Sequence, residues 1–97
     1  MADYEKPVYV GQSLTVKLNT KQVVTGATLA IGYEDPIGNT GSWSATIDPL
    51  VNTKLFYIYI PDTDGIWKVW SDVIFSGGIQ QYGKVRTIKV LKRGQVN

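Results

Sequence analysis

The stretch "DTDGIWKVW", residues 62–70, is the part of the chain where side chains capable of chemistry lie closest together. Asp62 and Asp64 stand two residues apart, and Trp67 and Trp70 follow them after a glycine. Carboxylates are ligands that Ca²⁺ prefers, and a pair of acids can hydrolyse a glycosidic bond. Tryptophan rings can stack on a sugar or a nucleic-acid base. Calcium binding, glycoside hydrolysis and stacking on a sugar or base are therefore the functions to consider for this stretch.

The acids are explained more simply as turn formers. Aspartate favours turns because its side chain accepts hydrogen bonds from nearby backbone N–H groups. Glu34, Asp35 and Asp48 lie in other turns, and the spacing of Asp62 and Asp64 is too short to define a metal site. Whether Asp62 and Asp64 bind calcium stays open. We predict no catalytic residue and no cofactor, and therefore a protein that is not an enzyme.

Composition limits the classes of function. The 97 residues make one domain, residues 1–97, with no cysteine and no histidine. This removes thiolate chemistry, disulfides and the commonest zinc ligand. The net charge of +2 is too small to predict specific nucleic-acid binding. The sequence shows no signal peptide and no apolar run of the roughly 20 residues that a membrane span needs.

Apolar and polar residues alternate through most of the chain, which is typical of half-buried strands. "SLTVKL" alternates, and so do the two arms of a hairpin predicted over residues 28–47. "KLFYIYIP" is apolar on both faces, so the pattern cannot orient it. In the last strand Val85 has one parity while Ile88 and Val90 have the other, which predicts a bulge near Arg86 and Thr87. Six or seven short strands separated by turns predict an all-β antiparallel sandwich.

The tryptophans divide by parity. Trp43 and Trp67 are in phase with apolar neighbours, which predicts that they belong to the core. Trp70 shares its parity with Lys68 and Asp72, so it is the candidate for an exposed aromatic. Ile74 lies on the same face. Aromatic residues are enriched at interface hot spots, so Trp70, Ile74 and Lys68 are predicted to form a contact surface.

The C-terminal segment is the third candidate, because it is strongly basic. Two interpretations stay open, a contact surface for an acidic partner and a solvated edge strand whose lysines block unwanted pairing. As a contact surface its residues would be Arg86, Lys89 and Arg93, flanked by Lys84 and Lys92.

With the strands placed, residues 62–70 resemble the corner before the F strand of immunoglobulin-like domains. That corner reads Asp, any, Gly, any, Tyr, any, Cys, and the same spacing here gives Thr63, Gly65, Trp67 and Val69. The glycine matches. An apolar residue at the cysteine position is what a domain without disulfides needs. Trp67 stands at the tyrosine position of that corner, so the hydrogen bond that the tyrosine hydroxyl makes in immunoglobulin-like domains is expected to be lost.

Most of the chain is similar to the small immunoglobulin-like proteins of tailed bacteriophage virions. The residues concerned are "GATL", the "P-x-G" turn followed by "GSW", "G-x-W" before a long strand, and the spacing of the last glycine and valine. The resemblance implies an immunoglobulin-like sandwich of about seven strands that decorates a capsid or another virion part. It implies other virion proteins as partners and a location in the particle after synthesis in the host cytoplasm.

Other expectations remain beside this one. The alternative function is a carbohydrate- or host-surface-binding module, which would use the aromatic side chains and take a host glycan as its partner. A homo-oligomer stays open as well. We expect adhesion by contact, in which many weak copies act together on a repeated assembly.

Overall fold

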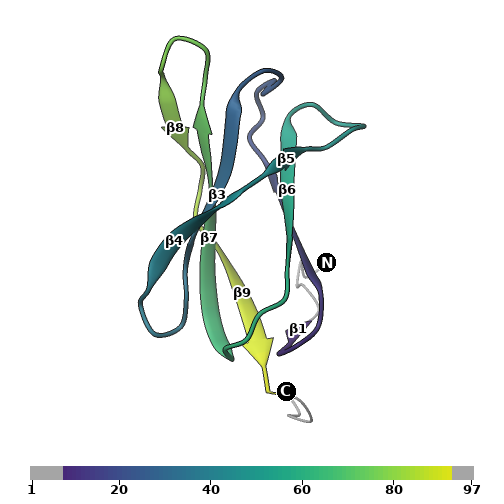
Figure 1. Ribbon diagram of the computed structural model, residues 1–97, viewed down its shortest axis with the longest axis vertical. Helices are drawn as coiled ribbons and strands as arrows, with labels where there is room; N and C mark the ends of the chain where they lie inside the picture. Colours follow the sequence, from purple (N-terminus) through teal and green to yellow (C-terminus); the bar gives the residue numbers. More distant parts are fainter. Residues whose placement is uncertain (1–7, 93–97) are drawn as a thin grey trace, which may run out of the picture.

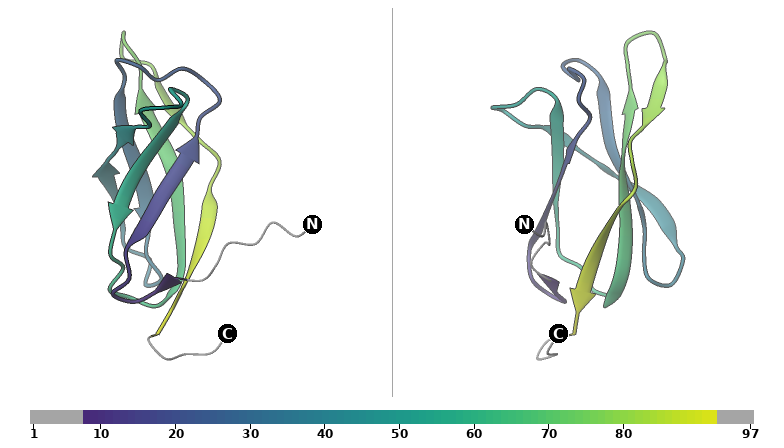
Figure 2. Two further views of the ribbon diagram at one scale, coloured as in Figure 1. Left: turned by 90° about the vertical axis from the view of Figure 1, so that its right-hand side faces the viewer. Right: turned by 180° about the vertical axis from the view of Figure 1, so that it is seen from behind.

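The computed structural model describes residues 8–92 of the chain, which form nine strands and no helix (Figure 1). The strands lie in two layered sheets (Figure 2). No segment among the described residues forms a helix long and apolar enough to cross a membrane. The strands are β1 (Val8–Tyr9), β2 (Leu14–Asn19), β3 (Thr28–Glu34), β4 (Thr40–Ser44), β5 (Thr46–Ile47), β6 (Lys54–Tyr59), β7 (Gly65–Ile74), β8 (Gln80–Tyr82) and β9 (Arg86–Leu91).

The large sheet has the strand order β1-β9-β7-β3-β4, and β8 also pairs with β7. The small sheet has the order β2-β6-β5. In immunoglobulin domains, the third, sixth and seventh strands form one sheet and the first, second, fourth and fifth form the other. Here β3, β7 and β9 make the first set, and β2, β5 and β6 belong to the second. Strand β1 differs from this scheme, because it pairs with β9 of the large sheet. The predicted immunoglobulin-like sandwich is confirmed.

The structure departs from an entirely antiparallel sandwich at one edge. Strand β1 pairs in parallel with the end of β9, with Val8 opposite Val90 and Tyr9 opposite Leu91. Hydrogen bonds from Val10 N to Leu91 O (2.9 Å) and from Gly11 N to Pro61 O (3.0 Å) continue this attachment. The end of the basic C-terminal strand is therefore not a solvated edge, because β1 covers it.

The core forms where the alternating apolar residues of the two sheets face one another. Burial removes apolar surface from water, which is the main stabilising term of a small domain. Strand β7 contributes every second residue from Trp67 to Val73 to this layer. The buried core residues are Val16, Leu18, Val24, Ile31, Leu55, Trp67, Val69, Val73, Ile88 and Val90.

Strand β6 is apolar on both faces, and the structure shows which face is inside. Leu55 is fully buried, and Tyr57 and Tyr59 pack against the core beside it. Phe56 and Ile58 have the opposite parity, and Ile58 is 57% exposed. The outer face of the small sheet therefore carries an apolar row that the sequence pattern left without an orientation.

The hairpin predicted over residues 28–47 is present, but its second arm divides between the sheets. Strand β4 pairs with β3, and β5 pairs with β6 of the small sheet. The change of sheet occurs at Ala45, whose backbone N–H still donates to Leu29 O at 3.0 Å. Figure 1 shows β5 running across from the end of β4 to β6, so that the chain passes here from the large sheet to the small one.

The phase slip in the last strand is present, but the predicted place was wrong. Asp72 lies opposite Tyr82, and Val69 lies opposite Arg86. Between these pairs β7 advances three residues while the other strand advances four. The extra residue lies in the segment between β8 and β9, residues 83–85, before Arg86 and Thr87. Gly83 allows close approach there, because a side chain at this position would collide with Ser71.

Trp67 provides a side-chain hydrogen bond at the corner before β7, where immunoglobulin domains use a tyrosine hydroxyl. Its indole N–H donates to the backbone carbonyl of Thr63 at 2.9 Å. In immunoglobulin domains the corner tyrosine hydroxyl makes a hydrogen bond to the backbone a few residues upstream. The tyrosine hydroxyl bond is absent, as expected, but the indole N–H of Trp67 supplies a comparable link to the upstream backbone.

We predict that truncating the two faces of β6 has very different effects. Leu55→Ala should lower the free energy of unfolding by about 2–5 kcal/mol, because it opens a cavity in a closed layer. The matched control Ile58→Ala should change it by only about 0.5 kcal/mol, because its side chain is exposed. Chemical denaturation measures both. Equal losses would contradict the orientation of β6.

Candidate functional site

Asp35 stabilises the β3–β4 turn by accepting hydrogen bonds from it. Its carboxylate accepts hydrogen bonds from the backbone N–H groups of Ile37 (3.0 Å) and Asn39 (2.8 Å) and from the Asn39 side chain (3.2 Å). Desolvation raises the pKa of this carboxyl, but these hydrogen bonds lower it more, so its pKa lies below the ordinary value. The interpretation of Asp35 as a turn former is confirmed.

Asp48 has a comparable part in the loop after β5. It accepts hydrogen bonds from Leu50 N (2.8 Å) and Val51 N (3.2 Å), and it forms an ion pair with Lys17 of β2 at 3.1 Å. The Leu50 N–H and the Lys17 ammonium group lower the pKa of Asp48. This acid therefore joins the loop to the neighbouring strand and is not available as a general acid.

The pair Asp62 and Asp64 does not assemble with other metal-binding side chains. Within residues 8–92, no group of three or more histidines, cysteines, aspartates or glutamates could hold a metal ion. Asp62 accepts a hydrogen bond from the hydroxyl of the adjacent Thr63 at 3.1 Å. The chain bends at Thr63, between the two acids, before it enters β7.

Trp70 lies on the outer face of the large sheet, as its parity predicts. It stands directly opposite Gly32 of β3, and its indole lies over that glycine. A side chain on Gly32 would collide with the indole, so the glycine provides the space in which Trp70 lies. Trp70 is thus partly buried on the outer face, with the indole packed on its cross-strand neighbour.

The β7 outer face, as we call it, consists of Lys68, Trp70 and Ile74 on β7 with Tyr82 of β8 beside them. Ile74 is 39% exposed and Tyr82 is 66% exposed. Asp72 lies between Trp70 and Ile74 and accepts a hydrogen bond from the Gln80 side chain at 2.8 Å. The face is therefore a row of apolar side chains on the central strand of a sheet, with polar residues between them.

Two of the basic candidates of the C-terminal segment, Arg86 and Lys89, point to different sides of β9. Lys89 lies opposite Ile66 on the outer face of the large sheet. Arg86 lies opposite Val69, with the parity of the core, and lines a groove of about 380 Å³ between β2 and β9. Arg93 lies outside the described residues. Arg86 and Lys89 therefore point to opposite sides of β9, because residues of opposite parity on a strand face opposite ways, and their part in a contact surface stays a prediction.

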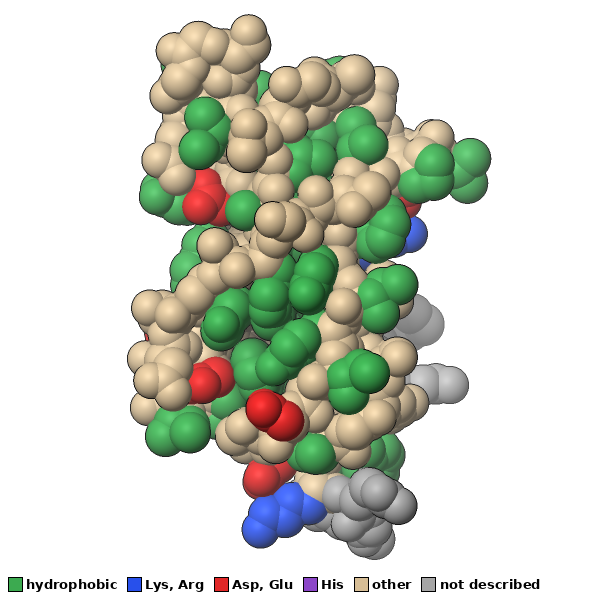
Figure 3. Space-filling view, in the orientation of Figure 1, with side chains coloured by type: hydrophobic (Ala, Val, Ile, Leu, Met, Phe, Trp, Pro, Cys, Tyr) green, Lys and Arg blue, Asp and Glu red, His purple; other side chains and the backbone are tan. Residues whose placement is uncertain are grey.

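Four aromatic side chains pack together between the two sheets, beside the crossover at Ala45. They are Tyr33, Trp43, Tyr57 and Tyr59. Figure 3 shows hydrophobic side chains exposed there, with acidic side chains beside them. The Trp43 ring is stacked between Tyr33, at a centroid distance of 4.5 Å, and Tyr57, at 5.1 Å. Tyr59 packs on Trp43 at 4.7 Å, and burial followed by the charge of Asp62 raises the pKa of its hydroxyl.

This aromatic layer bears on the prediction for the tryptophans. Trp67 is buried, as predicted, whereas Trp43 packs against the core but remains partly exposed. Tyr33 and Tyr57 both stack on the Trp43 ring, so Trp43 is exposed only in part. Sequence parity located both residues on the core side but could not show that Trp43 is only partly buried there.

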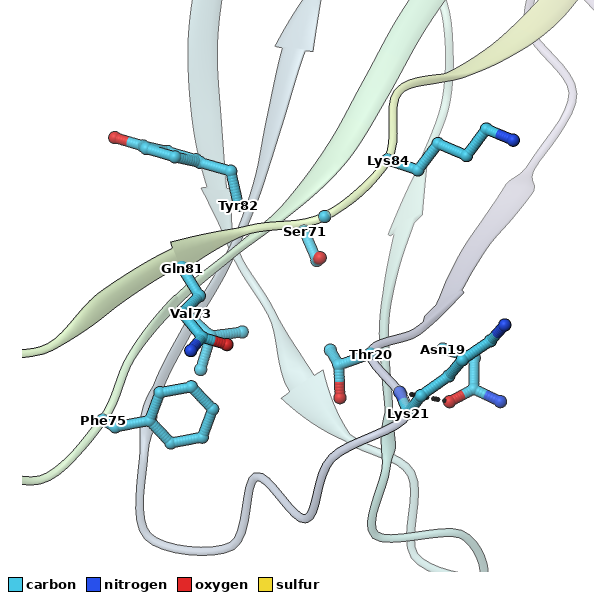
Figure 4. Close-up of a pocket in the computed structure, with 10 residues that line it drawn as sticks. Asn19, Thr20, Lys21, Ser71, Val73, Phe75, Gln81, Tyr82 and Lys84 are labelled. Atoms are coloured by element: carbon cyan, nitrogen blue, oxygen red, sulfur yellow. Dashed lines mark hydrogen bonds between the residues drawn. The ribbon is translucent and has the colours of Figure 1, made fainter.

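A second groove, of about 240 Å³, lies at the other end of the sandwich (Figure 4). Val73 and Phe75 form its apolar wall, while the ammonium groups of Lys21 and Lys84 point away from its interior. Its lining contains no acidic residue. The paired carboxylates that glycoside hydrolysis requires are therefore not found in this groove.

The comparisons with known proteins support the fold. No protein-family model and no curated protein matches the chain. A solved structure from Bacteroides vulgatus ATCC 8482, described as "a putative glycoside hydrolase", superposes with a TM-score of 0.62 at 13% sequence identity. The match covers 94% of this chain and 17% of that one. The similarity therefore concerns one domain-sized part of a longer protein, and it shows a shared sandwich.

We predict that acid destabilises the protein through Asp35 and Asp48. Both folded-state pKa values lie below the unfolded value of about 3.9, so the ionised carboxylates stabilise the fold at higher pH. That stabilisation should be lost as the pH falls below about 4, through the folded-state pKa values. Melting temperatures measured from neutral to acid pH test this.

The variant Asp35→Asn should melt at a lower temperature at neutral pH and show a weaker pH dependence below about pH 4. Asp62→Asn is the matched control, because Asp62 accepts its hydrogen bond from a side-chain hydroxyl. An unchanged acid profile in Asp35→Asn would contradict the part assigned to this turn.

Proposed function

We propose that this protein is a non-enzymatic accessory component of a tailed-phage virion, bound to a capsid protein or another virion protein through the β7 outer face. The kind of assembly rests on the resemblance carried by the ordered motifs of the sequence. The mode of action rests on the structure of the face itself. The proposed location is the virion, after synthesis in the host cytoplasm.

One observation carries the mode of action: Trp70 lies partly open on the central strand of the large sheet, supported from below by Gly32. A tryptophan held in this way loses little conformational freedom on binding, and tryptophans are enriched among the residues that dominate interface energies. Ile74 and Tyr82 extend the apolar area, and Lys68 borders it. Weak contacts of this size gain strength when many copies bind a repeated surface.

The non-enzymatic part of the proposal follows from what the acidic side chains do. Asp35 and Asp48 accept the hydrogen bonds of their own turns. The groove of Figure 4 lacks acidic residues in its lining. The Bacteroides protein carries the word hydrolase in its description, but the match covers 17% of that chain. A sandwich of this kind is thus compatible with a non-catalytic part of a larger assembly.

A second candidate function is carbohydrate or host-surface binding. The partly exposed aromatic layer around Trp43 favours it, as does the similarity to a protein described as a glycoside hydrolase. The stacking of Trp43 weighs against it, because a sugar ring binds to a free aromatic face and Tyr33 and Tyr57 both stack on the Trp43 ring. The contact function therefore has the stronger support.

We predict that charge on the β7 outer face prevents incorporation into particles. Ile74→Lys places an ammonium group in the apolar row, and burying it without a partner costs several kcal/mol. The matched control is Ile58→Lys, the same change at an exposed isoleucine on the outer face of the small sheet. Quantitative analysis of purified particles should show a copy number reduced at least about tenfold for Ile74→Lys and unchanged for Ile58→Lys.

If Ile58→Lys reduced the copy number and Ile74→Lys did not, the contact would belong to the small sheet, and the assignment to the β7 outer face would be contradicted. Titration of the isolated protein with glycans, followed by tryptophan fluorescence, separates the second candidate. Saturable binding that Trp43→Phe weakens would support carbohydrate recognition in place of virion attachment.

A further inference from the structure

Strand β4 (Thr40–Ser44) forms one edge of the large sheet. It pairs with β3 on one side, and on its other side no strand lies among the described residues. Figure 2 shows β4 at the margin of the molecule in the view from behind. Four of its five residues are exposed, the exception being Trp43.

The backbone groups that face outward can be assigned from the hydrogen bonds to β3. Asn39 O accepts from Asp35 N at 2.8 Å, and Ala45 N donates to Leu29 O at 3.0 Å. In an antiparallel pair, alternate residues direct both backbone groups to the same neighbour. Residues of odd number on β4 therefore bond to β3, and Thr40, Ser42 and Ser44 direct their N–H and C=O groups to the open side.

This edge lacks the devices that prevent strands from pairing. Proteins usually protect an exposed edge with charges, prolines, bulges or short strands. The segment from residue 36 to residue 47 has no charged residue, although 19% of the chain is charged. By comparison, the long edge strand β2 carries Lys17, and β1 and β5 have only two residues each.

We propose that β4 pairs antiparallel with β4 of a second copy of this chain, with Ser42 on the two-fold axis. In this register Ser42 lies opposite the partner's Ser42, and Thr40 lies opposite the partner's Ser44. All three outward-facing residues of each strand then exchange hydrogen bonds with the partner, two for each pair. A shift in either direction along the strand leaves some of these groups without a partner.

The side chains of β4 are compatible with the same register. On the outer face, Thr40 and the partner's Ser44 form a small polar pair of the kind that neighbouring strands tolerate well. On the inner face, Trp43 lies opposite the partner's Gly41, where the partner's Tyr33 ring fills the space that a side chain would take, so that two aromatic side chains meet. Since the strand is uncharged, two copies do not repel one another, and the contact is the same patch on both subunits.

A second copy fits this edge better than a charged partner does, because the strand has no charged side chain that could form an ion pair with such a partner. The contact is also limited to about five residues on each side, well below the area of a standard stable interface. The dimer is therefore weak in solution and depends on concentration. Pairing would continue the large sheet across the axis, and the inference does not depend on the virion assignment.

A single cysteine tests the register, because the chain contains no other. In Ser42→Cys the two Cα atoms across the axis would lie about 5.5 Å apart, within the range of a disulfide. In the matched control Ser44→Cys they would lie about 14–15 Å apart, since each is four residues along the strand from the position opposite the other, and the strands themselves are about 5 Å apart. Mild oxidation should cross-link Ser42→Cys at least about tenfold faster than Ser44→Cys.

Sedimentation velocity over a range of concentrations tests the pairing without a cross-link. Ser42→Pro removes the N–H that faces the partner but no hydrogen bond to β3, and Ser42→Lys adds the charge that protects natural edges. Both should raise the dimer dissociation constant by about tenfold or more, while Ser42→Ala should leave it within about twofold. Near-ultraviolet circular dichroism confirms that each variant is folded.

Three results would overturn the proposal. The protein could remain a monomer at all concentrations, it could dimerise equally well as folded Ser42→Lys, or Ser44→Cys could cross-link as fast as Ser42→Cys. The last two would assign dimerisation to another surface, and a monomer would leave β4 as an edge for a different protein.

Discussion

The two-residue alternation of strand β7 is the constraint on which the rest of the structure depends. This strand pairs with β3, β8 and β9, so its side chains decide what lies between the sheets and what lies outside. Trp67 faces inward and connects the corner to the core through Thr63. Trp70, three residues later, faces outward over Gly32. One strand thus provides both the packing of the domain and its candidate contact surface.

Much of the fold could be predicted because alternation is a local property. The hairpin of β3 and β4 and the inward parity of Trp67, Val69 and Val73 are readable from the residues alone. Strand β6 could not be oriented, since Phe56 and Ile58 are as apolar as Leu55 and only the opposing sheet distinguishes them. The bulge was misplaced for a similar reason: its position depends on the pairing partners of Tyr82 and Arg86.

The candidate site was predictable in part. Parity alone separates Trp70 from Trp67, but the support that Gly32 gives to Trp70 requires the register of β3 against β7. Sequence proximity suggested that Arg86 and Lys89 act together, yet the strand directs them to opposite sides. The exposure of Trp43 depends on the crossover at Ala45, which no local pattern marks. Contacts between distant segments therefore account for most of what the sequence did not show.

The parallel pairing of β1 with β9 has a mechanical consequence. A force that pulls Val8 and Leu91 apart along the strands acts on neighbours that run in the same direction. Their hydrogen bonds lie across the direction of pull, so the bonds at Val90, Leu91 and Val10 share the load at the same time. A hairpin pulled from its open end would instead lose its bonds one after another. The first and last strands thus give the domain resistance to tension along its length.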